Sequence, residues 1–313
     1  MTTVAATTSI ERELASVVGE ANVNHEQVEI NGVVPAVSVA PGSTEEVAAV
    51  LRLVSERELV VAPAGGFTRQ HAGGVPERID VLLRMERLNK ILQYDPGDLT
   101  IRLCAGLRLG ELQRRLAEHQ QWIPFDPPQA AAATMGGLLA TAAFGPLKQG
   151  FGSLRDFCIG IQFVLAEGKM GKGGGNVVKN VAGYDLMKLM IGSYGSLAVI
   201  TGANFKVFPR PRQTLTFVCP FHSLQEAIHF RDQVIKSPLA PMCMELISPA
   251  AGEYLSDPPV VHDPDHYAPA RPVAKPSQEW QIVVRVSGSD NILARCRREL
   301  GSAVAREIGR AHV

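Results

Sequence analysis

A chain of 313 residues exceeds the usual size of one hydrophobic core, which predicts about two domains. Its 31 basic side chains balance 31 acidic ones, so no net positive field is available to hold a polyanion, and nucleic-acid binding is disfavoured. The N-terminus lacks a secretory signal and no stretch reaches the roughly 18 apolar residues of a membrane span, so we expect a cytoplasmic protein without a membrane anchor of its own.

The N-terminal part of the chain predicts a helix, a strand and a glycine loop, in that order. Residues 43–58 begin with the capping-box pair Ser43 and Glu46 and place their apolar residues on one helical face. The apolar run 59–64 predicts a short buried strand, and residues 65–74 predict the loop. Glycines directly after a strand let consecutive backbone N–H groups converge on an anion such as a diphosphate, although an ordinary tight turn explains the same residues. The loop matches neither the G-x-G-x-x-G fingerprint nor a P-loop.

The middle of the chain continues with alternating elements. Strands are predicted at residues 81–85, 99–106 and 158–168, and an amphipathic helix at 107–120. The small-residue segment 130–145 has two interpretations. An alanine-rich helix packed tightly on a neighbour explains the alanines, whereas a backbone that approaches a flat, wide ligand explains the paired glycines beside a threonine.

The pattern changes after the proline-rich residues 209–211, where we place a domain boundary. Strands are predicted at 214–221 and 280–288, a helix at 223–236 and a long proline-rich loop at 257–278. His262 and His266 in this loop have metal-ligand spacing, but Pro264 between them disfavours a helix, so a solvated loop is preferred and no metal site is predicted. The five cysteines form no C-x-x-C motif, which argues against a disulfide framework or an iron–sulfur site.

Glycines and polar residues interrupt the apolar segment 176–201, which includes Lys179-Asn180, Gly183-Tyr184-Asp185 and Gly192-Ser193-Tyr194-Gly195. Each glycine inside a regular element costs about 0.5–1 kcal/mol unless it permits an unusual backbone angle or a close approach. We therefore expect a ligand or another chain segment to approach this backbone closely. Lys179 is a candidate for neutralising a phosphate, and capping a turn is its ordinary alternative.

Together these segments resemble the FAD-binding domain of the PCMH-type, or vanillyl-alcohol oxidase, superfamily, and more narrowly the E subunits of bacterial glycolate oxidase (glycolate dehydrogenase). The resemblance covers residues 31–211. The matching stretches are PAGGFT (63–68), ERLNKILQYDPGDLTIRLCAG (86–106), FDPP (125–128), ATMGGLLAT (133–141), FGSLRDFCIGIQFVLAEG (151–168) and VVKNVAGYDLMKLMIGSYGSLAVIT (177–201).

The resemblance implies an α+β fold that holds FAD extended between two subdomains. It divides the chain into an N-terminal helical extension (1–30), an FAD-binding PCMH-type domain (31–211) and a C-terminal α+β cap (212–313). The implied cofactor-binding residues are Ala64, Gly65, Gly66, Phe67 and Thr68 at the diphosphate; Thr134, Gly136, Gly137, Ala140, Thr141, Gly152 and Ser153 along the cofactor; and Gly195 and Ile200 near the adenosine.

The sequence departs from the family pattern at several places. Phe67 and Ala198 stand where relatives usually have glycine, and both are expected to tighten the space around the ligand. No histidine occupies the covalent flavin-linking position after Gly65-Gly66, so we expect non-covalent FAD. The chain ends without the segment that such subunits usually carry, which leaves open a truncated cap or non-native last residues.

The resemblance implies oxidation of glycolate to glyoxylate by a complex in which this chain binds FAD. Its partners would be a catalytic D-type flavoprotein subunit and an iron–sulfur F-type subunit, and contact with the inner membrane would come through such partners. One alternative is a self-sufficient FAD-dependent dehydrogenase of a 2-hydroxy acid such as D-lactate. Another is a non-catalytic assembly subunit with a vestigial flavin fold. The sequence identifies no catalytic residue.

Overall fold

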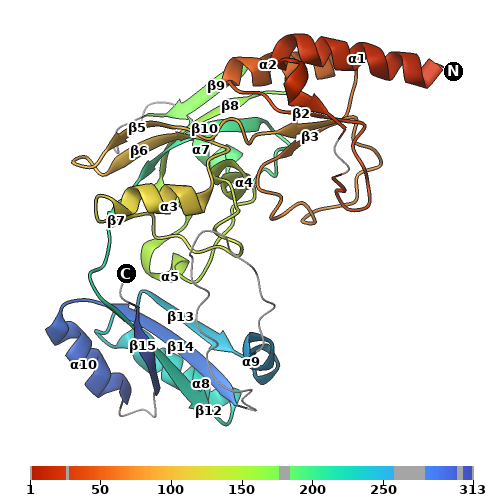
Figure 1. Ribbon diagram of the computed structural model, residues 1–313. Coiled ribbons are helices and arrows are strands. Elements are labelled where there is room, and N and C mark those ends of the chain that lie inside the picture. Colours follow the sequence, from red (N-terminus) through yellow and green to blue (C-terminus); the bar gives the residue numbers. More distant parts are fainter. Residues whose placement is uncertain (1, 26–27, 176–183, 257–278, 302–305, 312–313) are drawn as a thin grey trace. The chain divides into compact units, whose positions relative to one another are not determined.

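The computed structural model describes residues 2–25, 28–175, 184–256, 279–301 and 306–311 (Figure 1). The chain forms two compact units. The first comprises Met1–Ile123, Pro128–Ala143 and Ser153–Phe208, and the second comprises Pro124–Pro127, Phe144–Gly152 and Pro209–Val313. The second unit is thus assembled from three separate stretches of sequence. The predicted His262, His266 and Lys179, and the loop 257–278, lie outside the described residues.

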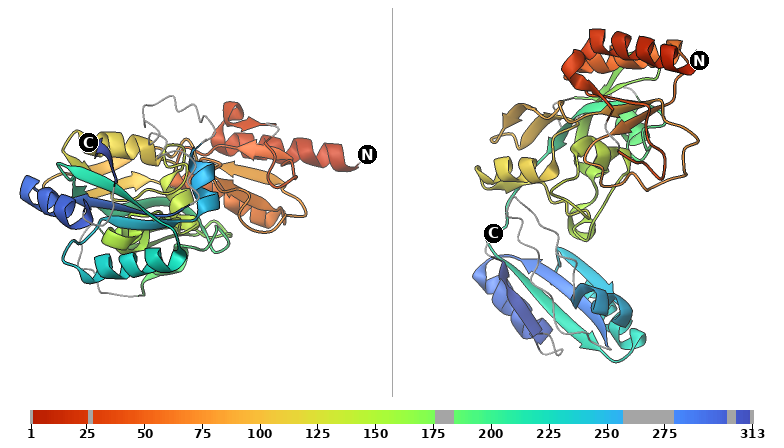
Figure 2. Two further views of the ribbon diagram at one scale, coloured as in Figure 1. Left: turned by 90° about the horizontal axis from the view of Figure 1, so that it is seen from below. Right: turned by 45° about the vertical axis from the view of Figure 1, so that its right-hand side comes forward.

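The first unit begins with a four-stranded sheet of order β1-β2-β4-β3. Its strands are β1 (Val23–Asn24), β2 (Val37–Val39), β3 (Val61–Ala64) and β4 (Val81–Arg84), and β4 is parallel to both β2 and β3. Helices α1 (Thr2–Val18) and α2 (Thr44–Glu56) lie side by side against it (Figures 1 and 2), with the short 3-10 helix η1 (Glu20–Asn22) following α1. Leu14, Val47 and Leu51 of the helices share one core with Val37 and Val81 of the sheet.

A five-stranded antiparallel sheet of order β5-β6-β10-β8-β9 completes the first unit. It contains β5 (Ile91–Asp95), β6 (Thr100–Cys104), β8 (Cys158–Val164), β9 (Met170–Gly174) and β10 (Val199–Lys206). The other elements of this unit are α3 (Leu109–Ala117), β7 (Gln121–Trp122), α4 (Met135–Ala140), α6 (Leu154–Phe157) and α7 (Leu186–Met190). The chain then leaves the unit through β11 (Phe208–Pro209).

The second unit is an antiparallel sheet of order β13-β14-β12-β15 with helices packed on one face. Its elements are α5 (Lys148–Phe151), β12 (Thr214–Phe221), α8 (Leu224–Lys236), β13 (Cys243–Ile247), α9 (Pro249–Ser256), β14 (Trp280–Ser287), α10 (Asp290–Gly301) and β15 (Arg306–Ala311). Phe217 of β12 and Val284 of β14 are buried with Phe230 of α8 and Leu293 of α10, so both helices cover the same face of the sheet.

Most predicted elements form where their caps and apolar spacing place them. The helix predicted at 43–58 is α2, whose Ser43 side chain accepts a hydrogen bond from the backbone N–H of Glu46 at 3.1 Å. The helix predicted at 223–236 is α8, capped in the same way by Ser223. The predicted alanine-rich helix within 130–145 is only the six residues of α4, and the rest of that segment consists of turns and loops.

Candidate cofactor site

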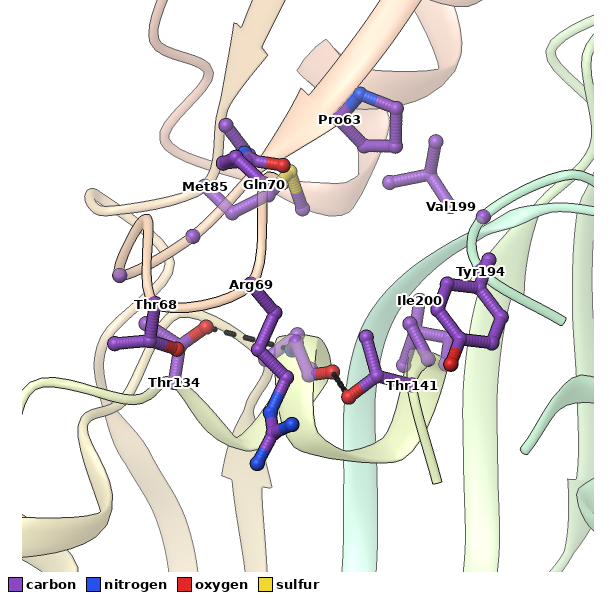
Figure 3. Close-up of a pocket in the computed structure, with 18 of the residues that line it drawn as sticks. Pro63, Thr68, Arg69, Gln70, Met85, Thr134, Thr141, Tyr194, Val199 and Ile200 are labelled. Atoms are coloured by element: carbon purple, nitrogen blue, oxygen red, sulfur yellow. Dashed lines mark hydrogen bonds between the residues drawn. The ribbon is translucent and has the colours of Figure 1, made fainter. Parts of the chain in front are cut away.

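Three glycine-containing segments of the first unit enclose one cavity with an empty volume of about 870 Å³, part of it open to solvent (Figure 3). The segments are the loop after β3, the turn that begins α4, and the turn before β10. All of the predicted cofactor-binding residues except Gly152 and Ser153 line this cavity: Ala64, Gly65, Gly66, Phe67, Thr68, Thr134, Gly136, Gly137, Ala140, Thr141, Gly195 and Ile200. The fold therefore brings together the three glycine-containing segments that the family resemblance assigns to the cofactor.

Gly152 and Ser153 are not among the cavity-lining residues, and each has a local structural role. Gly152 ends α5 with a φ of +92°, in the left-handed region that favours glycine. The Ser153 backbone N–H donates to the Asp156 carboxylate at 2.7 Å, within the capping box that begins α6. The positive φ of Gly152 and the capping hydrogen bond of Ser153 are local structural roles, and contact of either residue with the cofactor stays a prediction.

The glycines of the first loop allow it to lie directly on the segment that leads into α4. A Cβ atom added to Gly65 would overlap the Thr134 hydroxyl, and one added to Gly66 would overlap the backbone carbonyl of Ala132. Gly136 approaches the neighbouring backbone in the same way, because its N–H donates to the Ala105 carbonyl at 2.7 Å. Larger residues at these positions would push the cavity walls apart.

The turn before β10 forms the third wall and is fixed to the second. The Tyr194 N–H donates to the Ala140 carbonyl at 2.8 Å, and the Gly192 N–H donates to the Leu139 carbonyl at 3.0 Å. Gly195 has a φ of +76°, and a Cβ there would lie 2.9 Å from the Pro63 ring. The glycines at 192 and 195 therefore let this turn contact both other segments, as their unusual placement in the sequence predicted.

Hydrogen-bond donors are left open along the first loop. Within the described part of the chain, no acceptor takes the backbone N–H groups of Gly65, Gly66, Phe67 or Thr68. By contrast, the hydroxyls of α4 are used within the helix itself: Thr134 accepts from the Gly137 N–H, and Thr141 donates to the Gly137 carbonyl at 2.8 Å (Figure 3). Unpaired backbone donors beside a cavity are the feature expected of an anion-binding loop.

Phe67 belongs to the glycine loop by its backbone, while its ring packs against buried apolar side chains. Its φ is +55°, which is uncommon for a bulky residue. Its ring packs against a small buried cluster that includes Ile79 and Leu82, and the Arg84 guanidinium carbon lies 5.9 Å from the ring centroid. Packing of the ring thus offsets the cost of the left-handed backbone.

Sequence reasoning did not identify Arg69 and Met85, which also line the cavity. The Arg69 Nε atom is buried and has no hydrogen-bond partner among the described residues. The sequence held one indication of this role for Arg69, namely its position directly after Thr68 in the glycine loop. The described residues that line the cavity include no carboxylate and no histidine, so none of them is an evident general base.

Asp126, in the second unit, has a pKa well above the usual value of an aspartate. Burial raises the pKa of Asp126 to about 6, although the hydrogen bond from the Leu147 N–H at 3.1 Å and the charge of Arg285 act in the opposite direction. Gly145 packs directly on Asp126, which leaves no space there for a side chain. The described residues contain no group of three or more side chains suited to holding a metal ion.

Comparison with known proteins shows which family model and which solved structures the chain resembles. Residues 35–173 match the family model described as an FAD binding domain. The solved structure of an alkyldihydroxyacetonephosphate synthase superposes with a TM-score of 0.76 at 21% identity, covering 97% of this chain and 62% of that one. The chain thus has the α+β fold of PCMH-type FAD-binding structures, and its residues 35–173 are similar to an FAD-binding domain.

Curated relatives show which enzymes and enzyme subunits the chain resembles in sequence. D-lactate dehydrogenase of Anaerostipes hadrus is 34% identical over 224 residues, which is 71% of this chain and 47% of that protein. The glycolate oxidase subunit GlcE of Escherichia coli strain K12 is 43% identical over 139 residues, 44% of this chain and 39% of that protein. The chain is therefore similar to a D-lactate dehydrogenase and to a glycolate oxidase subunit, and the matched part spans less than half the length of each of these two relatives.

Among the described residues, no helix combines the length and apolar character that crossing a membrane requires.

Proposed function

We propose that this chain binds FAD non-covalently and serves as the FAD-binding subunit of an enzyme that oxidises a 2-hydroxy acid. The observation that carries the proposal is the loop of Gly65 to Thr68, whose four N–H groups have no acceptor among the described residues and which lines the cavity. Hydrogen bonds to a charged phosphate contribute about 1.5–3 kcal/mol each, so a few of these donors suffice for stable binding.

In this proposal the residues of the cavity have separate tasks. The amides of Gly65 to Thr68 hold the diphosphate, the backbone around Gly136 and Gly137 lies along the cofactor, and Gly195 and Ile200 border the adenosine. The chemistry that FAD supplies when bound is acceptance of a hydride from the carbon that carries the hydroxyl. Domain 31–211 would bind the cofactor, and 212–313 would form the cap.

Two findings favour a role beside partner subunits. Among the described residues, those that line the cavity include no carboxylate or histidine to remove the hydroxyl proton, and the five scattered cysteines of the sequence offer no cluster motif for passing electrons onward. The similarity to GlcE, a glycolate oxidase subunit, agrees with this reading. We therefore propose glycolate as substrate, with a D-type flavoprotein subunit and an iron–sulfur F-type subunit as partners.

A second candidate is a self-sufficient D-lactate-type dehydrogenase. It is favoured by the similarity to D-lactate dehydrogenase, which extends over 71% of this chain. Turnover of D-lactate by the purified chain with an artificial electron acceptor would support this candidate. Activity that appears only after the D-type and F-type partners are added would support the subunit role.

The proposed cofactor is tested by the visible spectrum of the purified chain before and after denaturation, with the released compound identified by mass. Release of intact FAD by denaturation supports non-covalent binding. A colourless chain that also fails to take up added FAD would contradict the proposal, and flavin that stays with the polypeptide after denaturation would contradict non-covalent attachment.

A further inference from the structure

Arg69 is the charged side chain among the described residues that line the cavity. The remainder of the lining is apolar, hydroxyl or amide in character, and it includes no carboxylate that could pair with the guanidinium. Figure 3 shows the Arg69 side chain extending from the glycine loop toward the part of α4 between Thr134 and Thr141. A lone cation in such a cavity favours an anionic occupant.

The hydrogen-bonding state of Arg69 supports the same conclusion. Its Nε atom is shielded from solvent and has no partner in the described part of the chain. A buried donor without a partner costs about 1–3 kcal/mol, so in a native structure it calls for an explanation such as an absent ion or ligand. The neighbouring loop amides, Gly65 to Thr68, have no partner among the described residues either.

We propose that Arg69 is a cofactor-positioning residue that pairs with the diphosphate of FAD. The inference rests on the proposed FAD-binding function and adds to it a specific ionic contact. The four amides provide dipoles from the loop backbone, and the guanidinium provides a full charge beside them. A planar guanidinium can donate two parallel hydrogen bonds to phosphate oxygens, which a lysine ammonium cannot reproduce.

The pairing predicts that Arg69 recognises the phosphate-containing half of the ligand and not the flavin ring. The test measures binding of FAD, ADP and riboflavin to flavin-free protein by titration calorimetry. Arg69→Ala is expected to weaken FAD and ADP binding by a similar factor, about 10- to 100-fold, and to leave riboflavin binding unchanged. The affinity of Arg69→Lys for FAD and ADP should lie between those of the wild type and Arg69→Ala, because lysine keeps the charge but cannot donate two parallel hydrogen bonds.

Two controls separate this contact from loss of folding or of general charge. Arg114→Ala removes an exposed arginine of α3, which pairs with Glu111 outside the cavity lining, and should leave all three affinities unchanged. Arg69→Gln keeps a polar side chain, and its melting temperature without ligand should be no lower than that of the wild type, because the substitution removes a buried donor that has no partner among the described residues. If Arg69→Ala does not fold, the Gln and Lys variants still measure the loss of affinity.

The outcomes distinguish this inference from the proposed function. If the wild type binds FAD but the Arg69 variants bind FAD and ADP as tightly, the pairing is wrong and the FAD-binding function stands. If riboflavin binding falls while ADP binding does not, the arginine serves the flavin ring instead, which also overturns the pairing. A wild type that binds neither FAD nor ADP would overturn both proposals together.

Discussion

Replacement of Phe67 by glycine separates two opposing effects at one position. The substitution removes a ring that packs on Ile79 and Leu82, and it relieves a backbone held at a φ of +55°. Family resemblance suggests that glycine is the normal residue here and that Phe67 crowds the ligand. The structure predicts instead that the ring stabilises the loop and that its loss lowers stability.

The magnitude follows from the contacts. Full burial of a phenylalanine contributes about 1.5–3 kcal/mol, so the partly buried Phe67 contributes about 1–2 kcal/mol. The contact with Arg84 adds about 0.5 kcal/mol, and the greater freedom of glycine in the unfolded chain costs a further 0.5–1 kcal/mol or so. Relief of the left-handed backbone returns about 1–2 kcal/mol. The net loss for Phe67→Gly is about 1 kcal/mol, or roughly 2–4 °C in melting temperature for a unit of this size.

Phe67→Ala is the decisive comparison, because it removes the ring but still places a non-glycine residue at a positive φ, with the energetic cost of that conformation. It should be less stable than Phe67→Gly by about 1 kcal/mol. Gln120→Gly is a matched control: this exposed residue has a φ of +54°, so glycine relieves the backbone without loss of packing and should raise stability slightly. Thermal unfolding of the flavin-free variants measures the order of their stabilities. A Phe67→Gly protein at least as stable as the wild type would refute the anchoring role of the ring.

Three further predictions concern the cavity, the second unit and the thiols. Gly66→Ala should weaken FAD binding at least about tenfold, because the new Cβ overlaps the Ala132 carbonyl, whereas Gly74→Ala, with open space around it, should bind normally; equal titrations for both would count against the close approach. Burial raises the folded-state pKa of Asp126 to about 6, so the folded state holds this proton more tightly and stability falls as pH rises from about 4 to 6. Asp126→Asn should therefore gain about 1–2 kcal/mol over the wild type at pH 7.5, after screening by solvent, and little at pH 4; urea midpoints that shift equally at both pH values would contradict this. Burial also raises the pKa of Cys158 to about 12, so a thiol reagent at pH 8 should leave Cys158 unmodified until the protein unfolds, and its rapid labelling in the native state would show the strand to be open.

Local chemistry in the sequence predicts much of the fold. Ser43 caps the helix that it was predicted to cap, because a serine side chain bonds to the backbone three residues ahead whatever the tertiary contacts are; Ser223 caps α8 in the same way, although only the helix and not its cap was predicted. In the segment 176–201 the glycines predicted a close approach, because glycines in an apolar stretch are costly without one. At the other two cavity segments the local pattern left a tight turn or a packed helix as alternatives, and only the family resemblance joined all three segments in one cofactor site.

Features that depend on distant residues were not predictable. The alanines around α4 suggested a longer helix, but this segment is held by hydrogen bonds from Met135 and Gly136 to the chain near Ala105, which no local pattern encodes. The direction of the Phe67 ring depends on Ile79 and Leu82, and the isolation of Arg69 depends on which residues do not reach it. Sequence spacing alone carries none of this information.

The interleaved composition of the second unit affects how the protein can be divided and how it forms during synthesis. Pro124–Pro127 and Phe144–Gly152 belong to the second unit but precede its main stretch, Pro209–Val313, by many residues. A fragment that stops at Phe208 would therefore display two orphaned pieces of the other unit, and a fragment that starts at Pro209 would lack them. On the ribosome, both pieces emerge before β8 and β10, so the second unit cannot fold until strands β12 to β15 have been synthesised.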